Sequence, residues 1–302
     1  MRSISLYSSE PARGWLPWGV LVPFLLILFV AVPDVAGSKV LQYFHLADAQ
    51  WQPIGMLGLA LFLVVPFLAT GLLVLAWVHW VERRSLASIG LTRPGGFASL
   101  TRGIGVGVAT SFALVVMIWM AGGYSAQGYA SAFSSPVALM NIAILLPCFV
   151  IQAGVEEVIF RGWLMSVFAR KFNVFIAITV TCIVFAALHF GRKTPWHDTV
   201  LILAFSLFAC VWALKAGSIW SVMGWHAAWN WLLAVGFEVP VTGLDAKMPA
   251  LLVKLVPQGS VYLTGGTQGP EGSVLCGLFF VVGIAVLLVR DRVPRSGNGT
   301  KL

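Results

Sequence analysis

The stretch that decides the fold is residues 137–162, which read VALMNIAILLPCFVIQAGVEEVIFRG. Its first part is uncharged and approaches the length of about 20 residues that a helix needs to cross a bilayer. Glu156, Glu157 and Arg161 then follow inside the same apolar run. Each charge in hydrocarbon costs at least ~2.5 kcal/mol on insertion scales, so a membrane helix that carries three of them is a candidate functional segment.

The composition of the whole chain is that of a membrane protein. Of its 302 residues, 59% are hydrophobic and 10% are charged, whereas soluble domains average about 45–50% and about 25%. The net charge of +8 is better explained by membrane topology than by nucleic-acid binding, because no basic groove with interleaved aromatic residues is visible. The four cysteines lie in apolar runs without CxxC spacing, which predicts buried thiols.

The apolar runs predict an all-α polytopic membrane protein with about eight transmembrane helices. The runs lie near residues 16–32, 54–80, 103–122, 137–169, 172–190, 199–214, 218–236 and 273–289. Lys and Arg gather in alternate connecting segments, so we expect both termini to face the cytoplasm. On this topology Arg84 lies in a cytoplasmic loop, whereas Asp34, Lys39 and Glu271 lie in extracytoplasmic loops.

Helix geometry separates the charged residues of the decisive stretch. Glu157 and Arg161 are four residues apart and share a face, so they can form an ion pair that offsets the insertion cost of both. Glu156, displaced by about 100° from its neighbour, turns to another face and stays available for chemistry.

Two later runs add polar groups. His189 ends the fifth run, and His226 and Asn230 lie four residues apart in the seventh, so the last two should point into one cavity. A lone membrane histidine or asparagine usually makes a helix-packing hydrogen bond, but three spans with such groups favour a shared site. Gly103, Gly105 and Gly107 follow no strand, so close helix packing is favoured over a phosphate loop.

These motifs resemble a known family. Glu-Glu-x-x-x-Arg at 156–161, Phe-x-x-x-His at 185–189 and His-x-x-x-Asn at 226–230 are similar to the CPBP family of intramembrane proteases, which includes the type II CAAX prenyl endopeptidases and bacterial Abi proteins. The resemblance covers residues 136–236, with weaker echoes in residues 82–91 and 217–220. It implies a catalytic core over 136–236. Together with the apolar runs and the charge pattern, we expect N-terminal transmembrane helices and loops over 1–135, and an extracytoplasmic loop, last transmembrane helix and disordered tail over 237–302.

The resemblance also implies a role for each motif residue. Glu156 would activate a water molecule with help from His189, and His226 and Asn230 would stabilise the tetrahedral oxyanion. Glu157 and Arg161 would give structural support. Amide hydrolysis needs an activated water, donors for the oxyanion and a proton for the leaving amine, and these side chains can supply all three.

The sequence leaves the role of a metal open. Glu156, His189 and His226 would make a sufficient zinc set with water in the fourth position, yet there is no HExxH helix, and a metal-free glutamate and histidine site is equally compatible. Zinc is therefore the one cofactor that we consider.

Two other functions remain as alternatives to an intramembrane endopeptidase. One is a non-catalytic scaffold or immunity protein of the same family, against which the filled motif positions argue. The other is a proton-coupled transporter, against which the absence of an inverted repeat argues.

The expected partners are membrane lipids and a peptide or lipid-modified protein substrate that is cut near the cytoplasmic membrane face. No nucleic acid is expected, and neither the substrate sequence nor the oligomeric state can be predicted. The expected location is the plasma membrane of a bacterium.

Overall fold

The computed structural model describes residues 11–92, 94–189 and 196–289. In chain order the elements are α1 (Val22–Tyr43), α2 (Gly55–Ala76), η1 (Trp77–Val81), η2 (Leu86–Ile89), α3 (Gly96–Met120), β1 (Tyr124–Tyr129), η3 (Ser131–Ser134), α4 (Pro136–Glu157), η4 (Val158–Leu164), α5 (Met165–Lys171), α6 (Val174–Leu188), α7 (Trp196–Ala216), α8 (Trp220–Gly236), β2 (Val253–Pro257), α9 (Val261–Thr264), η5 (Gly266–Gly272) and α10 (Val274–Val289). The chain is thus mostly helical, as predicted.

Each of the eight predicted runs overlaps a helix. Within the described residues, six helical segments are long and apolar enough to cross a membrane: Val22–Tyr43, Gly55–Val81, Gly96–Met120, Pro136–Lys171, Trp196–Ala216 and Gly266–Val289. The chain is therefore an integral membrane protein. The number of crossings and the side on which the termini lie stay predictions, and the tail predicted to be disordered lies outside the described residues.

The first helix differs from its prediction. It begins at Val22, with a proline in its first turn, and continues to Tyr43, whereas the apolar run was placed at 16–32. Asp34 and Lys39 were predicted in a loop and instead lie within α1 on exposed positions. Hydropathy marks where apolar side chains stop, but backbone hydrogen bonding continues a helix through polar residues that face outward.

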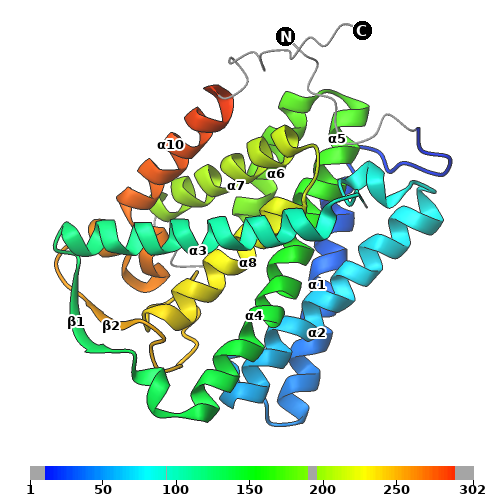
Figure 1. The fold of residues 1–302 in the computed structure, drawn as a ribbon. Helices are drawn as coiled ribbons and strands as arrows, with labels where there is room; N and C mark the ends of the chain where they lie inside the picture. Colours follow the sequence, from blue (N-terminus) through cyan, green and yellow to red (C-terminus); the bar gives the residue numbers. More distant parts are fainter. Residues whose placement is uncertain (1–10, 93, 190–195, 290–302) are drawn as a thin grey trace, which may run out of the picture.

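The longest helical segment lies near the centre of the bundle. α4, η4 and α5 form one continuous run of 36 residues from Pro136 to Lys171. Figure 1 shows α4 between the α1–α2 pair and α8, and α4 packs against both α2 and α8. η4 is a π-helical segment, and such segments inside α-helices are frequent at functional sites. The segment that carries the two glutamates is therefore held by helices on both sides.

Glycine allows α3 and α8 to come into close contact. A Cβ atom at Gly103 would lie 2.1 Å from the carbonyl oxygen of Ser221, and one at Gly107 would lie 2.5 Å from that of Trp225. A Cβ atom on Gly224 of α8 would likewise lie 2.1 Å from the carbonyl oxygen of Leu100. The predicted packing role of this glycine run is confirmed for Gly103 and Gly107.

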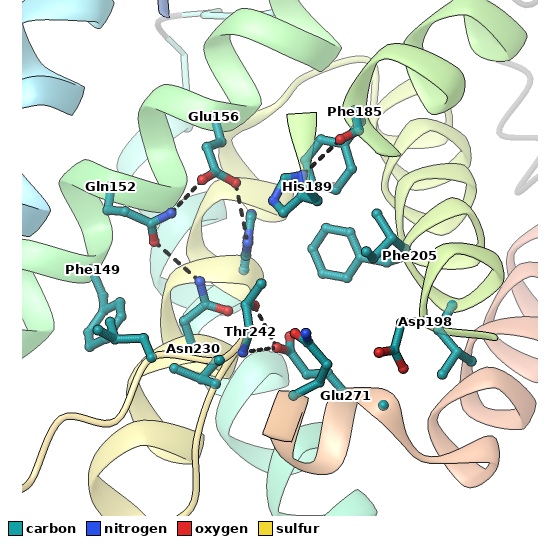
Figure 2. A pocket seen from close by; sticks show the side chains of 18 of the residues that line it. Phe149, Gln152, Glu156, Phe185, His189, Asp198, Phe205, Asn230, Thr242 and Glu271 are labelled. Atoms are coloured by element: carbon teal, nitrogen blue, oxygen red, sulfur yellow. Dashed lines mark hydrogen bonds and ion pairs between the residues drawn. The ribbon is translucent and has the colours of Figure 1, made fainter. Parts of the chain in front are cut away.

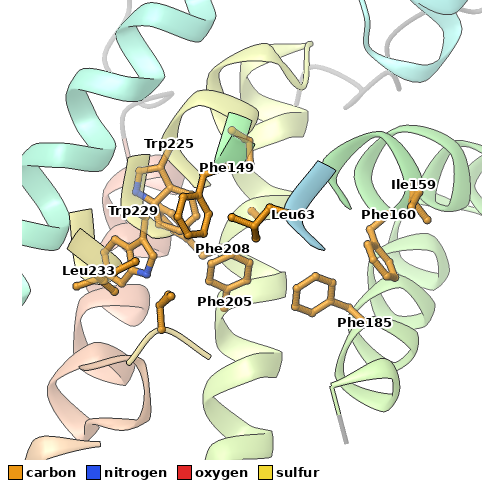
Figure 3. Packing of buried hydrophobic residues seen from close by; sticks show 14 of the residues in the cluster. Leu63, Phe149, Ile159, Phe160, Phe185, Phe205, Phe208, Trp225, Trp229 and Leu233 are labelled. Carbon is orange, nitrogen blue, oxygen red and sulfur yellow. The ribbon is translucent and has the colours of Figure 1, made fainter. Parts of the chain in front are cut away.

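A cluster of buried aromatic rings lies between α7, α8 and α10 (Figure 3). The ring of Phe208 lies 5.0 Å from that of Trp225, and Trp225 lies 5.3 Å from both Phe205 and Trp229. Stacked aromatic side chains bury large apolar areas and pack in defined geometries. The cluster gives α8 a fixed rotation about its axis, and with it the direction of the polar residues on that helix.

A two-stranded antiparallel sheet adds the only strands of the described residues. β1 pairs with β2, from Tyr124 opposite Pro257 to Tyr129 opposite Val253. The two strands come from the loop before α4 and the loop after α8, which the charge pattern places on the same side of the membrane. The pairing joins these loops, and the buried phenol of Tyr124 donates a hydrogen bond to the Thr264 carbonyl oxygen at 2.7 Å.

A second buried acidic group lies apart from the decisive stretch. Glu82 is fully buried and accepts hydrogen bonds from the indole nitrogens of Trp77, at 3.1 Å, and Trp163, at 2.8 Å. The guanidinium of Arg84 binds its other oxygen through Nε at 2.6 Å, and also donates to Ser166 Oγ at 3.0 Å. Arg84 lies in a loop, as predicted, but is only 4% exposed, because the carboxylate partner compensates its burial.

Candidate active site

The predicted site residues line one cavity of about 310 Å³. Its walls come from α2, α4, α6, α7, α8 and α10, and one end is closed by residues 241–244 and by η5. Glu156, His189, His226 and Asn230 all lie on this wall (Figure 2). Three spans that are far apart in the sequence thus bring their polar residues together.

Glu156 is held at one of its two oxygens. Gln152, one turn earlier on α4, donates from Nε2 to Glu156 Oε1 at 2.6 Å. Asn230 on α8 donates from Nδ2 to Gln152 Oε1 at 3.2 Å. Because a carboxylate only accepts, it fixes the orientation of the Gln152 amide, and this amide in turn fixes that of Asn230. A chain of hydrogen bonds therefore connects α8 to Glu156 (Figure 2).

The second oxygen of Glu156 faces His226. Glu156 Oε2 lies 3.8 Å from His226 Nε2, and the Glu156 side chain is 13% exposed. This separation exceeds a direct hydrogen bond but can be bridged by one water molecule. Of the described carboxylates on α4, Glu156 alone lines the cavity, so it has the exposure that a general base requires.

Glu157 orients the His226 ring from behind. Glu157 Oε1 lies 2.9 Å from His226 Nδ1 and 2.9 Å from Arg161 Nη1. A carboxylate partner requires a proton on Nδ1, so Nε2 points toward the cavity as a lone pair in the neutral ring and as a donor in the charged ring. The ion pair that was predicted between Glu157 and Arg161 is confirmed, and both side chains are fully buried.

Arg161 supports two further parts of the site. Its guanidinium donates to Ser206 Oγ of α7 at 3.1 Å and lies 4.5 Å from the centre of the Phe185 ring. Phe185 in turn contacts His189, whose ring centre lies 4.3 Å away. The Phe185 carbonyl oxygen lies 2.7 Å from His189 Nδ1. Because this carbonyl can only accept a hydrogen bond, Nδ1 carries the proton, and Nε2 of the neutral His189 ring carries none.

Three cavity residues were missed by sequence reasoning. Gln152 carried a usable signal, since it lies four residues before Glu156 on the same helix face. Asp198 lies in the first turn of α7 and is 5% exposed. Glu271 lies in η5, where it accepts hydrogen bonds from Trp229 Nε1 at 2.9 Å and Thr242 Oγ1 at 2.7 Å. Neither of these acids had a motif partner, because folding alone brings their segments to the cavity.

The arrangement does not form a three-residue metal site. No group of three His, Cys, Asp or Glu side chains in the described part of the chain is close enough together to hold a metal ion. Of the pairs that face the cavity, Glu156 Oε2 and His226 Nε2 lie 3.8 Å apart. The four cysteines are buried, as predicted, and none forms a disulfide.

One comparison with known proteins identifies the segment that carries the site. The family model for the type II CAAX prenyl endopeptidase Rce1-like proteins matches residues 138–232. No curated protein and no solved structure matches the chain. The matched segment contains the Glu-Glu-x-x-x-Arg, Phe-x-x-x-His and His-x-x-x-Asn motifs and runs from α4 to α8. Residues 138–232 are therefore similar to the Rce1-like type II CAAX prenyl endopeptidases, consistent with the CPBP family that the three motifs predict.

Proposed function

We propose that the chain is an intramembrane endopeptidase that hydrolyses a peptide bond of a membrane-associated or lipid-modified protein in this cavity. The domain match supports a protease-type enzyme. The observation that carries the proposal is the pairing of Glu156 Oε2 with His226 Nε2 across 3.8 Å inside the cavity. A fully committed structural carboxylate would not leave one oxygen facing a cavity and an oriented imidazole.

The proposed reaction begins with a water molecule between Glu156 and His226. Glu156 removes a proton from this water while its oxygen attacks the carbonyl carbon of the scissile bond. The charged form of His226, stabilised by Glu157, donates from Nε2 to the oxyanion, and the second N–H of Asn230 is the other donor. The proton held by Glu156 then passes to the leaving amine, and the C–N bond breaks. His189, in the same cavity, assists the proton transfers.

The apolar part of the cavity supports an apolar substrate segment. Phe62 and Phe67 of α2 face the cavity together with Leu201 and Ile202 of α7. These side chains favour contact with a lipid chain or an apolar peptide. We place the protein in the plasma membrane of a bacterium, with its substrate reaching the cavity from the bilayer or its surface.

Zinc stays part of the proposal as an option to be tested. If it binds, Glu156 Oε2 and His226 Nε2 would be two of its donors, and His189 would have to approach them. Zinc would then supply Lewis-acid activation of water.

The experiment is cleavage of a quenched peptide library by the purified protein in lipid nanodiscs. We expect wild type and Glu238→Gln to cleave and Glu156→Gln to be inactive, because Glu238 forms an ion pair with Lys254 outside the cavity. Each protein is assayed with and without a zinc chelator, which decides between a metal and a glutamate mechanism. Folded wild type that cleaves no peptide would contradict the proposal and favour a scaffold.

A further inference from the structure

The cavity carries an excess of negative charge. Glu156, Asp198 and Glu271 line it, and no Lys or Arg is among the described residues of its wall. Among the described residues of this wall, only His189 and His226 can become positive, so three carboxylates face two groups that can carry positive charge. The chain as a whole has a net charge of +8, so the negative charge of the cavity is opposite in sign to that of the chain.

Two of these carboxylates lie away from Glu156. In Figure 2, Asp198 and Glu271 lie on the other side of the cavity from Glu156. The bonds to Glu271 come from neutral donors, namely Trp229 Nε1 and the backbone N–H and hydroxyl of Thr242. They stabilise its charge but do not neutralise it.

One buried acceptor atom on the same wall lacks a donor. Asn230 is 7% exposed, and its Oδ1 is buried without a hydrogen-bond donor among the described residues. Asp198 is 6% exposed at its side chain, and its Oδ1 lies 3.0 Å from Nε2 of His197, which does not line the cavity. Buried acceptors in folded proteins nearly always have a donor, so the ligand is expected to supply one.

We propose that this cavity binds a cationic group of the substrate, the side chain of a lysine or arginine close to the bond that is cut. The location of that bond rests on the proposed function. Negative charge in a partly enclosed, low-dielectric space attracts a cation much more strongly than charge exposed to water. Ammonium and guanidinium groups also donate several hydrogen bonds, which suits the unfilled Asn230 oxygen and the carboxylates of the cavity.

The same charges select against a free carboxylate. A peptide whose cleaved end is a chain terminus would bring another negative charge into a cavity that already holds three carboxylates. Like charges in such a space repel strongly. The inference therefore favours an internal bond beside a basic residue over a bond a few residues from a free C-terminus.

The test measures binding rather than cleavage, so that it is independent of turnover. Glu156→Gln is placed in phosphatidylcholine nanodiscs, whose zwitterionic lipid does not attract basic peptides. Fluorescent apolar peptides that carry either one Lys or a Gln in its place are titrated with this variant. Each peptide is prepared with both ends blocked and with one end free. We expect the blocked Lys peptide to bind at least tenfold more tightly than its Gln twin, since a charge-assisted hydrogen bond contributes about that factor.

Two variants test whether the Lys preference depends on Asp198. Adding Asp198→Asn should reduce the Lys preference about tenfold, whereas Asp245→Asn, an exposed acid outside the cavity, should leave it unchanged. Equal affinity for the Lys and Gln peptides would overturn the inference, as would a preference that follows a free amino terminus instead of the Lys position. Tighter binding of the free-carboxylate peptide would also overturn it. If the peptides show a Lys preference but wild type cleaves no peptide, the cation site would be supported and the protease function contradicted.

Discussion

Two buried carboxylates in this molecule have opposite surroundings. Glu82 is fully buried, and its oxygens bind two indole N–H groups and the guanidinium of Arg84. Glu156 has one neutral donor, Gln152, on one oxygen, and its other oxygen faces His226 across 3.8 Å in a cavity. The sequence presents both as a glutamate near an arginine in an apolar setting. The two carboxylates differ in that both oxygens of Glu82 bind donors, whereas Glu156 Oε2 faces the cavity and His226.

The largest effect on activity is expected from neutralising Glu156. If it is the general base, Glu156→Gln should lower kcat by about 10²–10⁴, while the midpoint of thermal unfolding stays close to that of wild type. Activity is measured on the best library peptide, and unfolding by the intrinsic fluorescence of the same sample. Retained turnover in the variant would remove Glu156 from the mechanism.

Neutralising Glu82 should have the reverse effect. Glu82→Gln leaves Arg84 buried without its counter-charge, a change that costs about 3–5 kcal/mol in comparable pairs. We expect a large loss of stability in denaturant titrations, with unchanged kcat for each folded molecule. If Glu82→Gln lowered kcat in a fully folded sample, the distinction between the two carboxylates would fail.

A smaller effect should come from the residue that fixes Glu156. Gln152→Leu removes the donor to Glu156 Oε1 and the acceptor of Asn230. Because it orients the catalytic groups without contacting the reacting atoms, we expect kcat to fall about tenfold, as for the loss of one charge-assisted hydrogen bond, with little change in KM. Thr181→Val is the matched control, since Thr181 is buried on α6 outside the cavity. Equal kcat values for the two variants would contradict the positioning role.

The smallest effect is expected at Tyr124, far from both carboxylates in the sequence. Burial raises the pKa of the Tyr124 phenol above its ordinary value, so ionisation is easier in the unfolded chain. Stability from this group is present below about pH 10, the ordinary tyrosine pKa, and is lost as the pH rises toward the folded pKa. Tyr124→Phe should cost about 1 kcal/mol at pH 7, weaken this alkaline dependence and leave cleavage unchanged. Denaturant titrations at pH 7 and above pH 10 measure both effects, and an unaltered pH dependence would show that another group titrates there.

Hydropathy predicted most of the fold, because apolar runs mark helices that lie in lipid. It misplaced α1 because polar residues such as Asp34 can face outward without ending a helix. The spacing of Glu157 and Arg161 gave their ion pair directly, since residues four apart on a helix are neighbours. Such local rules depend only on the chain nearby.

The remaining parts of the site depend on contacts between distant segments. Asp198 and Glu271 reach the cavity only because α7 and η5 pack against the helices of the decisive stretch. Glu82 gave no sign of its burial, because its two indole donors include Trp163, 81 residues away. Single-sequence patterns carry no information about such pairings, so these residues could not be sorted in advance into structural and chemical groups.

The π-helical segment η4 has a consequence for how this chain can change over generations. A π turn holds one residue more than an α turn, so such a segment is what a single inserted codon leaves in an α-helix. Deleting one residue from η4 would let α geometry return while the helix beyond it keeps nearly its present rotation, because the π turn holds the extra residue. A deletion within α4 has no such compensation and would rotate Glu156 relative to the preceding helix by about 100°. We therefore expect insertions and deletions to be excluded from residues 137–157, while the loops between helices accept them.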